Sequence, residues 1–446
     1  MTEAPEPHAL AGGNLEWRLV RGGLTFGFGI VTGNVLGFAR VALTAYLLGT
    51  HSRADSLAVA VGPIDALNGV LINSLVFAFV PMLTARRDAD RASLFFKLRR
   101  GAVLIFSIMA VAIVAFAPWL IRILAPGLDP AFFPVSVNIL RVVALSTVAS
   151  GSAAIYCALL YTDRRFAPAA FYQASLNLFT VLGAVSLWPT LGVYGFAIGY
   201  TLGACAQFAV VFLAARSELP FHKLPRCDAK WRELLRRPAM IVAYAVSVAL
   251  NITFTRAWAT QEGTGMAAAL DYCMRGVGVP LAFLVNPLSN SLLPEIARLR
   301  NELRLREAFR VMDRTLGLAA LAAVSACAFA LLFREPAIAL LFERGSFTAE
   351  STRLVSDVFL GLGPSLIGWS LLELTSRSLF ALDRPWLPLA AGILPVILNI
   401  AITVSIHSHK PQLLGLGASA GLMAAFLFVF FLSRFDRRRW LGEYRP

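Results

Sequence analysis

Charge is scarce in this 446-residue chain. Only 15% of its residues are Asp, Glu, Lys or Arg, and 58% are hydrophobic, whereas soluble domains average about 25% charged and about 45–50% apolar residues. The apolar residues form long runs, which is typical of a polytopic membrane protein and argues against a large soluble core. The first 17 residues contain no apolar run. They therefore predict a cytoplasmic tail and no signal peptide.

Cysteine and histidine are also rare. The five cysteines show no ligand spacing, so we expect no disulfide framework, metal site or cofactor. All five histidines fall in tails or loops, and no paired carboxylates or nucleophile–base set shares a predicted cleft. This disfavours an enzyme such as a membrane glycosyltransferase or acyltransferase.

The apolar runs predict an all-α protein with about twelve transmembrane segments. The segments are expected at 21–49, 54–84, 101–125, 134–161, 166–188, 191–215, 238–260, 264–297, 313–333, 353–381, 385–406 and 412–434. The net charge of +14 comes mainly from Lys and Arg clustered in alternate loops. That pattern places both termini in the cytoplasm and argues against nucleic acid as the partner.

The residue order of the first half recurs in the second half at an offset of roughly 213 to 223 residues. Two repeats of six spans each share one orientation, so we expect two six-helix bundles related by a pseudo-two-fold axis along the membrane normal, the plan of a transporter. Matching pairs are Arg40 and Arg256, Asp55 and Asp271, Pro63 and Pro280, and Asp163 and Asp383. The expected parts are a tail at 1–20, a bundle at 21–215, a basic amphipathic linker at 216–237, a bundle at 238–434 and a basic tail at 435–446.

Arginines inside the predicted spans indicate a binding site. Arg40 and Arg275 both fall within the membrane, and Arg256 lies closer to its edge. Because a central arginine costs about 2.5–3.5 kcal/mol on insertion scales, it normally faces a cavity or a partner. A guanidinium makes bidentate bonds to phosphate, which suits a diphosphate headgroup. Two other readings stay open: an Asp271–Arg275 salt bridge within one helix, and snorkelling of Arg40 to the surface.

Glycines accompany these arginines. The first segment and segment 264–297 each carry a Gly-rich stretch, and either a gate or plain close packing would account for it. The gate candidates are Gly33, Gly37, Gly276, Gly278 and Pro280. A separate polar set forms a weak candidate cation site, with ordinary interhelix hydrogen bonding as the alternative. It consists of Asn251, Asn399 and Thr403.

Several stretches resemble the MurJ/MviN family, the lipid II flippases of the multidrug/oligosaccharidyl-lipid/polysaccharide exporter superfamily, which also contains the MATE transporters. The likeness spans nearly the whole chain. It rests on GNVLGFARVALTAYLLGT followed by Ala54-Asp55, on AFVPML at 78–83, on YTDRRFAPAAFYQASLNL near 161–178, on YCMRGVGVP at 272–280 and on SRSLFALDRPWLP at 376–388.

The resemblance implies translocation of an undecaprenyl-diphosphate-linked saccharide from the inner to the outer leaflet of a bacterial inner membrane. The headgroup would be held in a cationic central cavity while the two bundles alternate in access. Candidate driving forces are the membrane potential or a Na⁺ or H⁺ gradient, and candidate partners are anionic phospholipid and envelope-glycan polymerases. Substrate-site residues implied or suggested are Arg40, Asp55, Arg275, Arg256 and Asn34.

The chain departs from the family pattern in three ways. Asn34 stands where the family has its first arginine, the charged residues expected in the second segment are absent, and twelve spans are predicted where fourteen are typical. These departures leave three alternatives: a flippase for O-antigen or exopolysaccharide units that does not act on lipid II, a cation-coupled MATE-like exporter, and a non-transporting scaffold.

Overall fold

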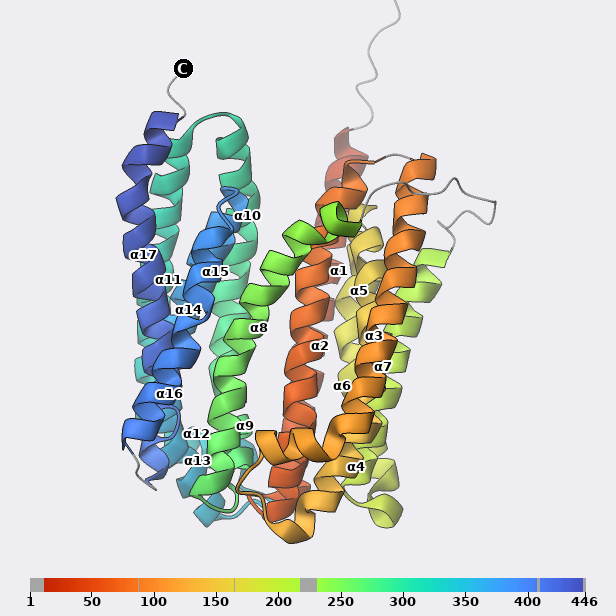
Figure 1. Cartoon of the computed structure of the whole chain (residues 1–446), viewed down its shortest axis with the longest axis vertical. Helices are drawn as coiled ribbons and strands as arrows, with labels where there is room; N and C mark the ends of the chain where they lie inside the picture. Colours follow the sequence, from red (N-terminus) through yellow and green to blue (C-terminus); the bar gives the residue numbers. More distant parts are fainter. Residues whose placement is uncertain (1–11, 87, 164, 217–230, 407–409, 444–446) are drawn as a thin grey trace, which may run out of the picture. The chain divides into compact units, whose positions relative to one another are not determined.

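The computed structural model describes residues 12–86, 88–163, 165–216, 231–406 and 410–443. Within these ranges every regular element is a helix (Figure 1). The first half contains α1 (Gly12–Leu48), α2 (Ser52–Thr84), α3 (Asp88–Leu124), η1 (Pro130–Phe132), α4 (Phe133–Ala144), α5 (Ser146–Thr162), α6 (Phe166–Leu191) and α7 (Tyr194–Ala215). The second half contains α8 (Trp231–Glu262), α9 (Met266–Pro280), η3 (Leu281–Val285), α10 (Asn286–Asn301), α11 (Leu305–Leu332), α12 (Arg334–Phe342), α13 (Ala349–Leu362), α14 (Ser365–Ala381), α15 (Trp386–Gly392), α16 (Leu394–Ile406), η4 (Pro411–Leu413) and α17 (Leu416–Glu443).

Each of the twelve predicted segments is helical. Among the described residues, ten helical stretches are long and apolar enough to cross a membrane, and an eleventh results if α13 and α14, bent by 45°, count as one span. The segment predicted at 264–297 is not a continuous helix. It consists of α9, a π-helical turn at Leu281–Val285 and α10. The fold is therefore that of an all-α polytopic membrane protein, and the pseudo-two-fold axis stays a prediction.

The expected boundaries differ locally from the helices. Part of the predicted tail at 1–20 is helical, because α1 begins at Gly12, and α17 continues to Glu443, within the predicted tail at 435–446. Of the predicted linker at 216–237, residues 217–230 lie outside the described residues, and the remainder from Trp231 onward forms the start of α8.

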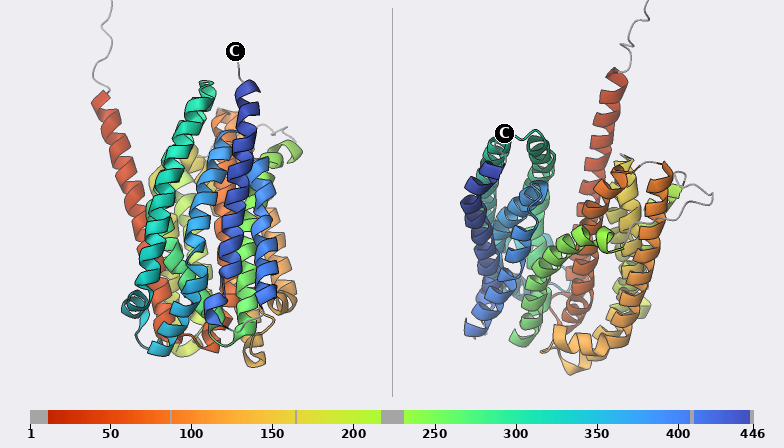
Figure 2. Two further views of the ribbon diagram at one scale, coloured as in Figure 1. Left: turned by 90° about the vertical axis from the view of Figure 1, so that its left-hand side faces the viewer. Right: turned by 45° about the horizontal axis from the view of Figure 1, so that its top comes forward.

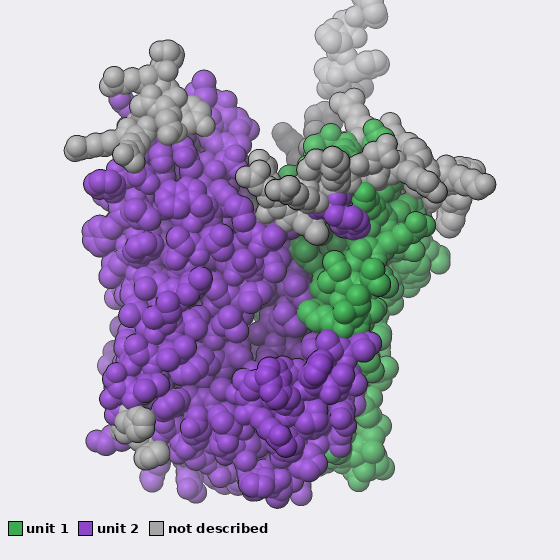
Figure 3. All heavy atoms as spheres, in the orientation of Figure 1, with its two compact units in different colours: residues 1–40, 75–110, 145–228 green, residues 41–74, 111–144, 229–446 purple. Residues whose placement is uncertain are grey.

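The chain packs into two compact units (Figure 3). Unit 1 comprises residues 1–40, 75–110 and 145–228, and unit 2 comprises residues 41–74, 111–144 and 229–446. Helices α1, α2 and α3 each contribute to both units, because the division falls within them at residues 40, 74 and 110. Unit 2 thus contains the first part of α2 together with all of α8 to α17, which is where the charged residues discussed below meet.

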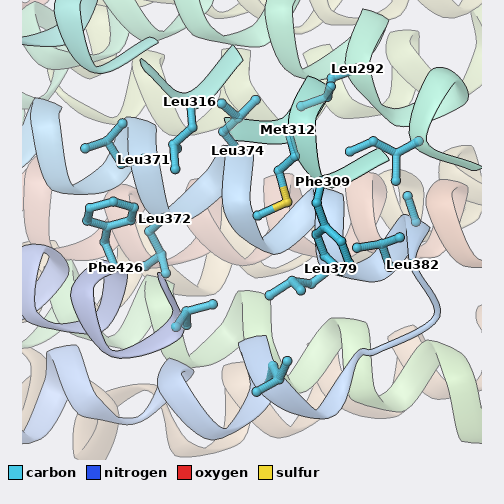
Figure 4. Packing of buried hydrophobic residues seen from close by; sticks show 14 of the residues in the cluster. Leu292, Phe309, Met312, Leu316, Leu371, Leu372, Leu374, Leu379, Leu382 and Phe426 are labelled. Carbon is cyan, nitrogen blue, oxygen red and sulfur yellow. The ribbon is translucent and has the colours of Figure 1, made fainter. Parts of the chain in front are cut away.

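The core of unit 2 is built from α10, α11, α14, α15 and α17. Leu292, Phe309, Leu374 and Phe426 are among its buried residues (Figure 4), and α14 packs against both α11 and α17 (Figures 1 and 2). Burial of a leucine or phenylalanine side chain is worth about 1.5–3 kcal/mol in transfer free energy from water. In a membrane the matching gain comes from close packing, because lipid tails are as apolar as the core.

Small residues bring helices together in unit 1. Gly195, Gly199 and Gly203 recur every four residues on α7 and lie against the backbone of α6 near Gly183 and Leu176. This small-xxx-small spacing lets two helix backbones approach closely. Also in unit 1, Tyr156 of α5 lies edge-on to the ring of Phe95, and the two ring centroids are 5.2 Å apart.

Candidate functional site

Helix α9 takes its N-terminal cap from another helix. Its N-cap residue, Gly265, has no side chain and a left-handed backbone with φ of 85°. The acceptors come from Asp55 near the start of α2: Oδ2 accepts from the Gly265 N–H at 2.6 Å and Oδ1 from the Ala268 N–H at 2.9 Å. A carboxylate at a helix N-terminus satisfies orphan N–H groups and complements the helix dipole. Asp55 is only 5% exposed, so this cap is buried.

The turn between α1 and α2 is anchored to the same part of unit 2. The Tyr272 hydroxyl on α9 donates to the Gly49 carbonyl at 2.8 Å, and the Ser346 N–H donates to the Tyr46 carbonyl at 2.8 Å. Thr50 Oγ1 and Ser351 Oγ lie 2.8 Å apart. Together with the Asp55 cap, these bonds fix the first turns of α2 beside α9 and the α12–α13 loop.

Arg256 on α8 is a buried arginine held by an acid. Its Nε donates to Asp271 Oδ1 at 3.0 Å and its Nη2 to the same oxygen at 2.5 Å. The Arg256 side chain is 7% exposed, and its Nη1 has no hydrogen-bond partner among the residues that the structure describes. The guanidinium lies on α2 at Gly62, where a Cβ atom would come within 2.6 Å of Arg256 Cζ. Glycine at 62 therefore makes room for this charge between α2, α8 and α9.

Arg275 on α9 is more open. Its Nη2 donates to Asp65 Oδ2 of α2 at 3.3 Å, and the two side chains are 42% and 26% exposed. The intrahelical Asp271–Arg275 salt bridge considered from the sequence is therefore wrong. Asp271 pairs with Arg256 of α8 instead, and Arg275 pairs with Asp65 of α2, because both helices contact α9. The predicted residues Asp55, Arg256 and Arg275 thus make separate contacts along α2, α8 and α9, which we call the α2–α8–α9 network, and Asp65 and Gly62 also take part in these contacts.

The amino-acid sequence alone does not place Asp65 and Gly62 in this network. Asp65 was a lone acid in an apolar run, a signal that marks function but names no partner. Gly62 precedes Pro63. A Gly-Pro pair within a span predicts a bend in the helix and does not predict that an arginine side chain packs against the glycine.

Two other predicted substrate residues belong to unit 1. Arg40 on α1 is 9% exposed, and its Cζ lies 5.8 Å from the centroid of the Tyr200 ring of α7, a cation–π contact. A burial this deep does not fit snorkelling to the surface. Asn34, on the same helix, is half-buried. Contact of Arg40 and Asn34 with the substrate stays a prediction.

The predicted gate residues lie in two settings. Gly33 and Gly37 face Asn177 of α6: Asn177 Nδ2 donates to the Gly33 carbonyl at 3.0 Å, and a Cβ at Gly37 would lie 3.1 Å from the same nitrogen. These two glycines allow close helix packing in unit 1. In unit 2, Gly276 and Gly278 lie in the last turns of α9, and Pro280 ends it just before the π-helical turn. A hinge at that break stays a prediction.

The candidate cation residues form a closed, neutral network in unit 2. Asn399 Nδ2 of α16 donates to Asn251 Oδ1 at 2.8 Å and to Thr255 Oγ1 at 2.8 Å on α8. Thr403 Oγ1 donates to Asn399 Oδ1 at 3.0 Å, and Asn251 Nδ2 donates to the Ala418 carbonyl of α17 at 3.4 Å. The network therefore joins α8, α16 and α17 by hydrogen bonds alone, and no carboxylate takes part in these bonds.

Replacing Asn399 with leucine should lower the stability of the purified protein. The change removes the partner of the buried Asn251 side chain and of the half-buried Thr403 hydroxyl. Each buried group left unsatisfied costs about 1–3 kcal/mol. The melting temperature of the wild type should be equal in sodium chloride and choline chloride. The side-chain oxygens that would bind a cation already accept hydrogen bonds from Asn399 and Thr403. A melting temperature higher by several degrees in sodium chloride than in choline chloride would show instead that sodium binds the native state and stabilises it by mass action.

Among the described residues, no group of three or more His, Cys, Asp or Glu side chains is arranged to hold a metal ion. The chemistry that the α2–α8–α9 network offers is recognition of an anion by guanidinium groups.

A sequence model of the family described as lipid II flippase MurJ matches residues 44–444. The chain is 26% identical to the probable lipid II flippase MurJ of Rhizobium meliloti (strain 1021), over 96% of this chain and 82% of that protein. It is 27% identical to the lipid II flippase MurJ of Burkholderia cenocepacia, over 92% and 82%.

Solved structures agree on the fold. A lipid II flippase MurJ in an inward closed conformation superposes with a TM-score of 0.80 at 18% identity, covering 92% of this chain and 87% of that one. An inward-facing multidrug resistance transporter of the MATE family gives 0.75 at 14% identity, covering 92% and 96%. Because the family model matches most of the sequence, the chain belongs to the MurJ lipid II flippase family.

Proposed function

We propose that this protein moves a polyprenyl-diphosphate-linked saccharide, lipid II or a close relative, from the inner to the outer leaflet of the bacterial inner membrane. The observation that carries the proposal is Arg275. This arginine lies in an apolar helical segment, and its side chain remains 42% exposed beside Asp65. Family membership supplies the class of cargo, and this side chain supplies the chemistry that binds it.

The two arginines that pair with acids in this network differ in availability. Arg256 is 7% exposed and makes two bonds to Asp271, so it serves the packing of α8, α9 and α2. Arg275 is six times more exposed and makes a longer contact. A guanidinium that is partly exposed forms bidentate, charge-assisted bonds with a diphosphate. We therefore assign headgroup binding to Arg275 and a structural role to Arg256.

The test is complementation in a bacterium depleted of its own lipid II flippase. The wild type should restore growth, and Arg275→Ala should fail at equal membrane level. Loss of charge-assisted bonds worth about 1.5–3 kcal/mol each corresponds to a headgroup affinity lower by roughly 10-fold to 100-fold. Arg141→Ala is the matched control, because Arg141 also lies in a candidate span but is exposed, and its Nε donates to a backbone carbonyl, that of Val114, at 3.4 Å.

The outcomes separate substrate from site. Growth with Arg275→Ala as well as the wild type would make Arg275 a structural residue of a genuine lipid II flippase. No growth with well-expressed wild type would contradict lipid II as cargo and favour another lipid-linked glycan. Deletion in the native host should then remove a surface polysaccharide.

A further inference from the structure

Helices α2 and α9 run parallel in a constant register. The Asp55 contact with Gly265 and the Asp65 contact with Arg275 each join residues 210 apart in the sequence. Ten residues of helix span about 15 Å, so the two contacts tie the same pair of helices at two levels. One level is the buried backbone cap at Asp55, and the other is a side-chain ion pair at Asp65.

The ion pair at Asp65 is the looser tie. Its Nη2–Oδ2 distance is 3.3 Å with side chains 42% and 26% exposed, whereas the Asp55 oxygens lie 2.6 and 2.9 Å from backbone donors in a buried setting. Exposed ion pairs contribute little net stability, because water competes with the partner. A stronger anion than a carboxylate therefore competes at the same guanidinium without disturbing the cap.

We propose that Asp65 is the resident counter-ion of Arg275, a positioning residue whose place is taken by the diphosphate headgroup of the substrate. The inference rests on the proposed function and deepens it. In the ligand-free protein Asp65 holds the guanidinium in place and offsets its cost within an apolar segment. When a diphosphate binds Arg275, the Asp65 carboxylate faces an anion at close range, and like charges placed together repel. Binding thus loosens α2 from α9 at this level and leaves the Asp55 cap intact.

The Asp65–Arg275 ion pair also sets the affinity of the protein for the diphosphate headgroup. A counter-ion that must be displaced weakens ligand binding, and the repulsion that follows favours release of the headgroup. Asp271, one turn before Arg275 on α9, is already engaged by Arg256, so the competing acid for Arg275 comes from α2. Removing the charge at 65 should therefore strengthen diphosphate binding, the opposite of the effect of removing a ligand-binding residue.

The experiment measures binding of farnesyl diphosphate to the purified full chain, with inorganic pyrophosphate as the lipid-free probe. Asp65→Asn should bind farnesyl diphosphate about threefold to tenfold more tightly than the wild type, and Arg275→Gln at least tenfold more weakly. In the Arg275→Gln background, Asp65→Asn should have no further effect, as coupled residues in a double-mutant cycle behave. Asp65→Glu keeps the charge and should retain the wild-type affinity. Pyrophosphate should show the same order of variants at lower affinity if the headgroup alone is recognised.

Two results would overturn the counter-ion role while leaving the proposed function standing. One is unchanged or weaker binding by Asp65→Asn in a protein that melts at the wild-type temperature, which would make Asp65 a fixed brace. The other is equal tightening with and without Arg275, which would reflect the general field of the protein. If neither the wild type nor folded Asp65→Asn binds farnesyl diphosphate, both the counter-ion role and diphosphate-lipid transport fail.

Discussion

Replacing Gly62 with leucine should strongly destabilise the protein and abolish its transport. A Cβ atom at position 62 would lie 2.6 Å from Arg256 Cζ and 2.8 Å from Arg256 Nε and Nη2, well inside van der Waals contact. A leucine must therefore displace the guanidinium of an arginine whose side chain is 7% exposed and paired with Asp271. Breaking a buried ion pair costs about 3–5 kcal/mol, because each charge is left without its partner.

Gly69 provides the control on the same helix. It lies two helical turns after Gly62, and a Cβ atom at 69 would have nothing within 4 Å. Both substitutions replace glycine with the same apolar residue, so they share the effect on helix propensity. Thermal melting of both variants in detergent, with transport in vesicles, measures the difference. Equal melting temperatures for Gly62→Leu and Gly69→Leu would show that the Arg256–Gly62 contact does not stabilise the fold.

The sequence predicts where the helices of this protein lie better than it predicts which charged side chains pair between them. Long apolar runs and basic loops placed a helix at each of twelve segments, because a membrane requires every backbone group to bond within its own helix. The pairing of Arg275 was less accessible. An i, i+4 spacing made Asp271 the local candidate, but Asp65, 210 residues away, is the partner, and only the packing of α2 against α9 brings it there.

Breaks within segments show the same limit. The segments predicted at 264–297 and 353–381 are interrupted, the first by a π-helical turn after Pro280 and the second by a 45° bend around Pro364. Proline was visible at both places, and it removes a backbone donor and clashes with the preceding turn. Yet the first half also has prolines inside α3 and α6, at Pro118 and Pro189, where the helix continues. Tertiary packing decides which proline ends a helix.

Matching positions of the repeat also take different roles. Asp55 and Asp271 correspond in sequence order, but Asp55 caps the N-terminus of α9, whereas Asp271 binds the Arg256 side chain. The carboxylate was retained at both positions while its partners differ. A repeat therefore predicts where charge lies in the fold and leaves open what the charge does.

Replacing Asp55 with alanine should be nearly as damaging as Gly62→Leu. It leaves the N–H groups of Gly265 and Ala268 without their acceptor in a buried site. Bonds to a charged group are worth about 1.5–3 kcal/mol each, and the helix dipole adds up to ~2 kcal/mol in partly buried settings. We expect the free energy of unfolding to fall by at least about 3 kcal/mol, since two such bonds are lost. Transport should fall too, because α9 carries Arg275.

Asp129→Ala separates the effect of burial from that of capping. Asp129 also accepts from a backbone N–H, that of Ala131 at 2.9 Å, but its bond is exposed, so water can replace the carboxylate and the loss should stay below about 1 kcal/mol. Asp55→Asn, which keeps an amide oxygen but loses the charge, should fall between alanine and the wild type. Gly265 has no side chain, and its position leaves no room for one beside the Thr50 carbonyl, so the N-cap residue of α9 cannot replace the Asp55 carboxylate. If Asp55→Ala and Asp129→Ala melted alike, the α9 N-terminus would be satisfied by water, and the cap would not be what binds α2 to α9.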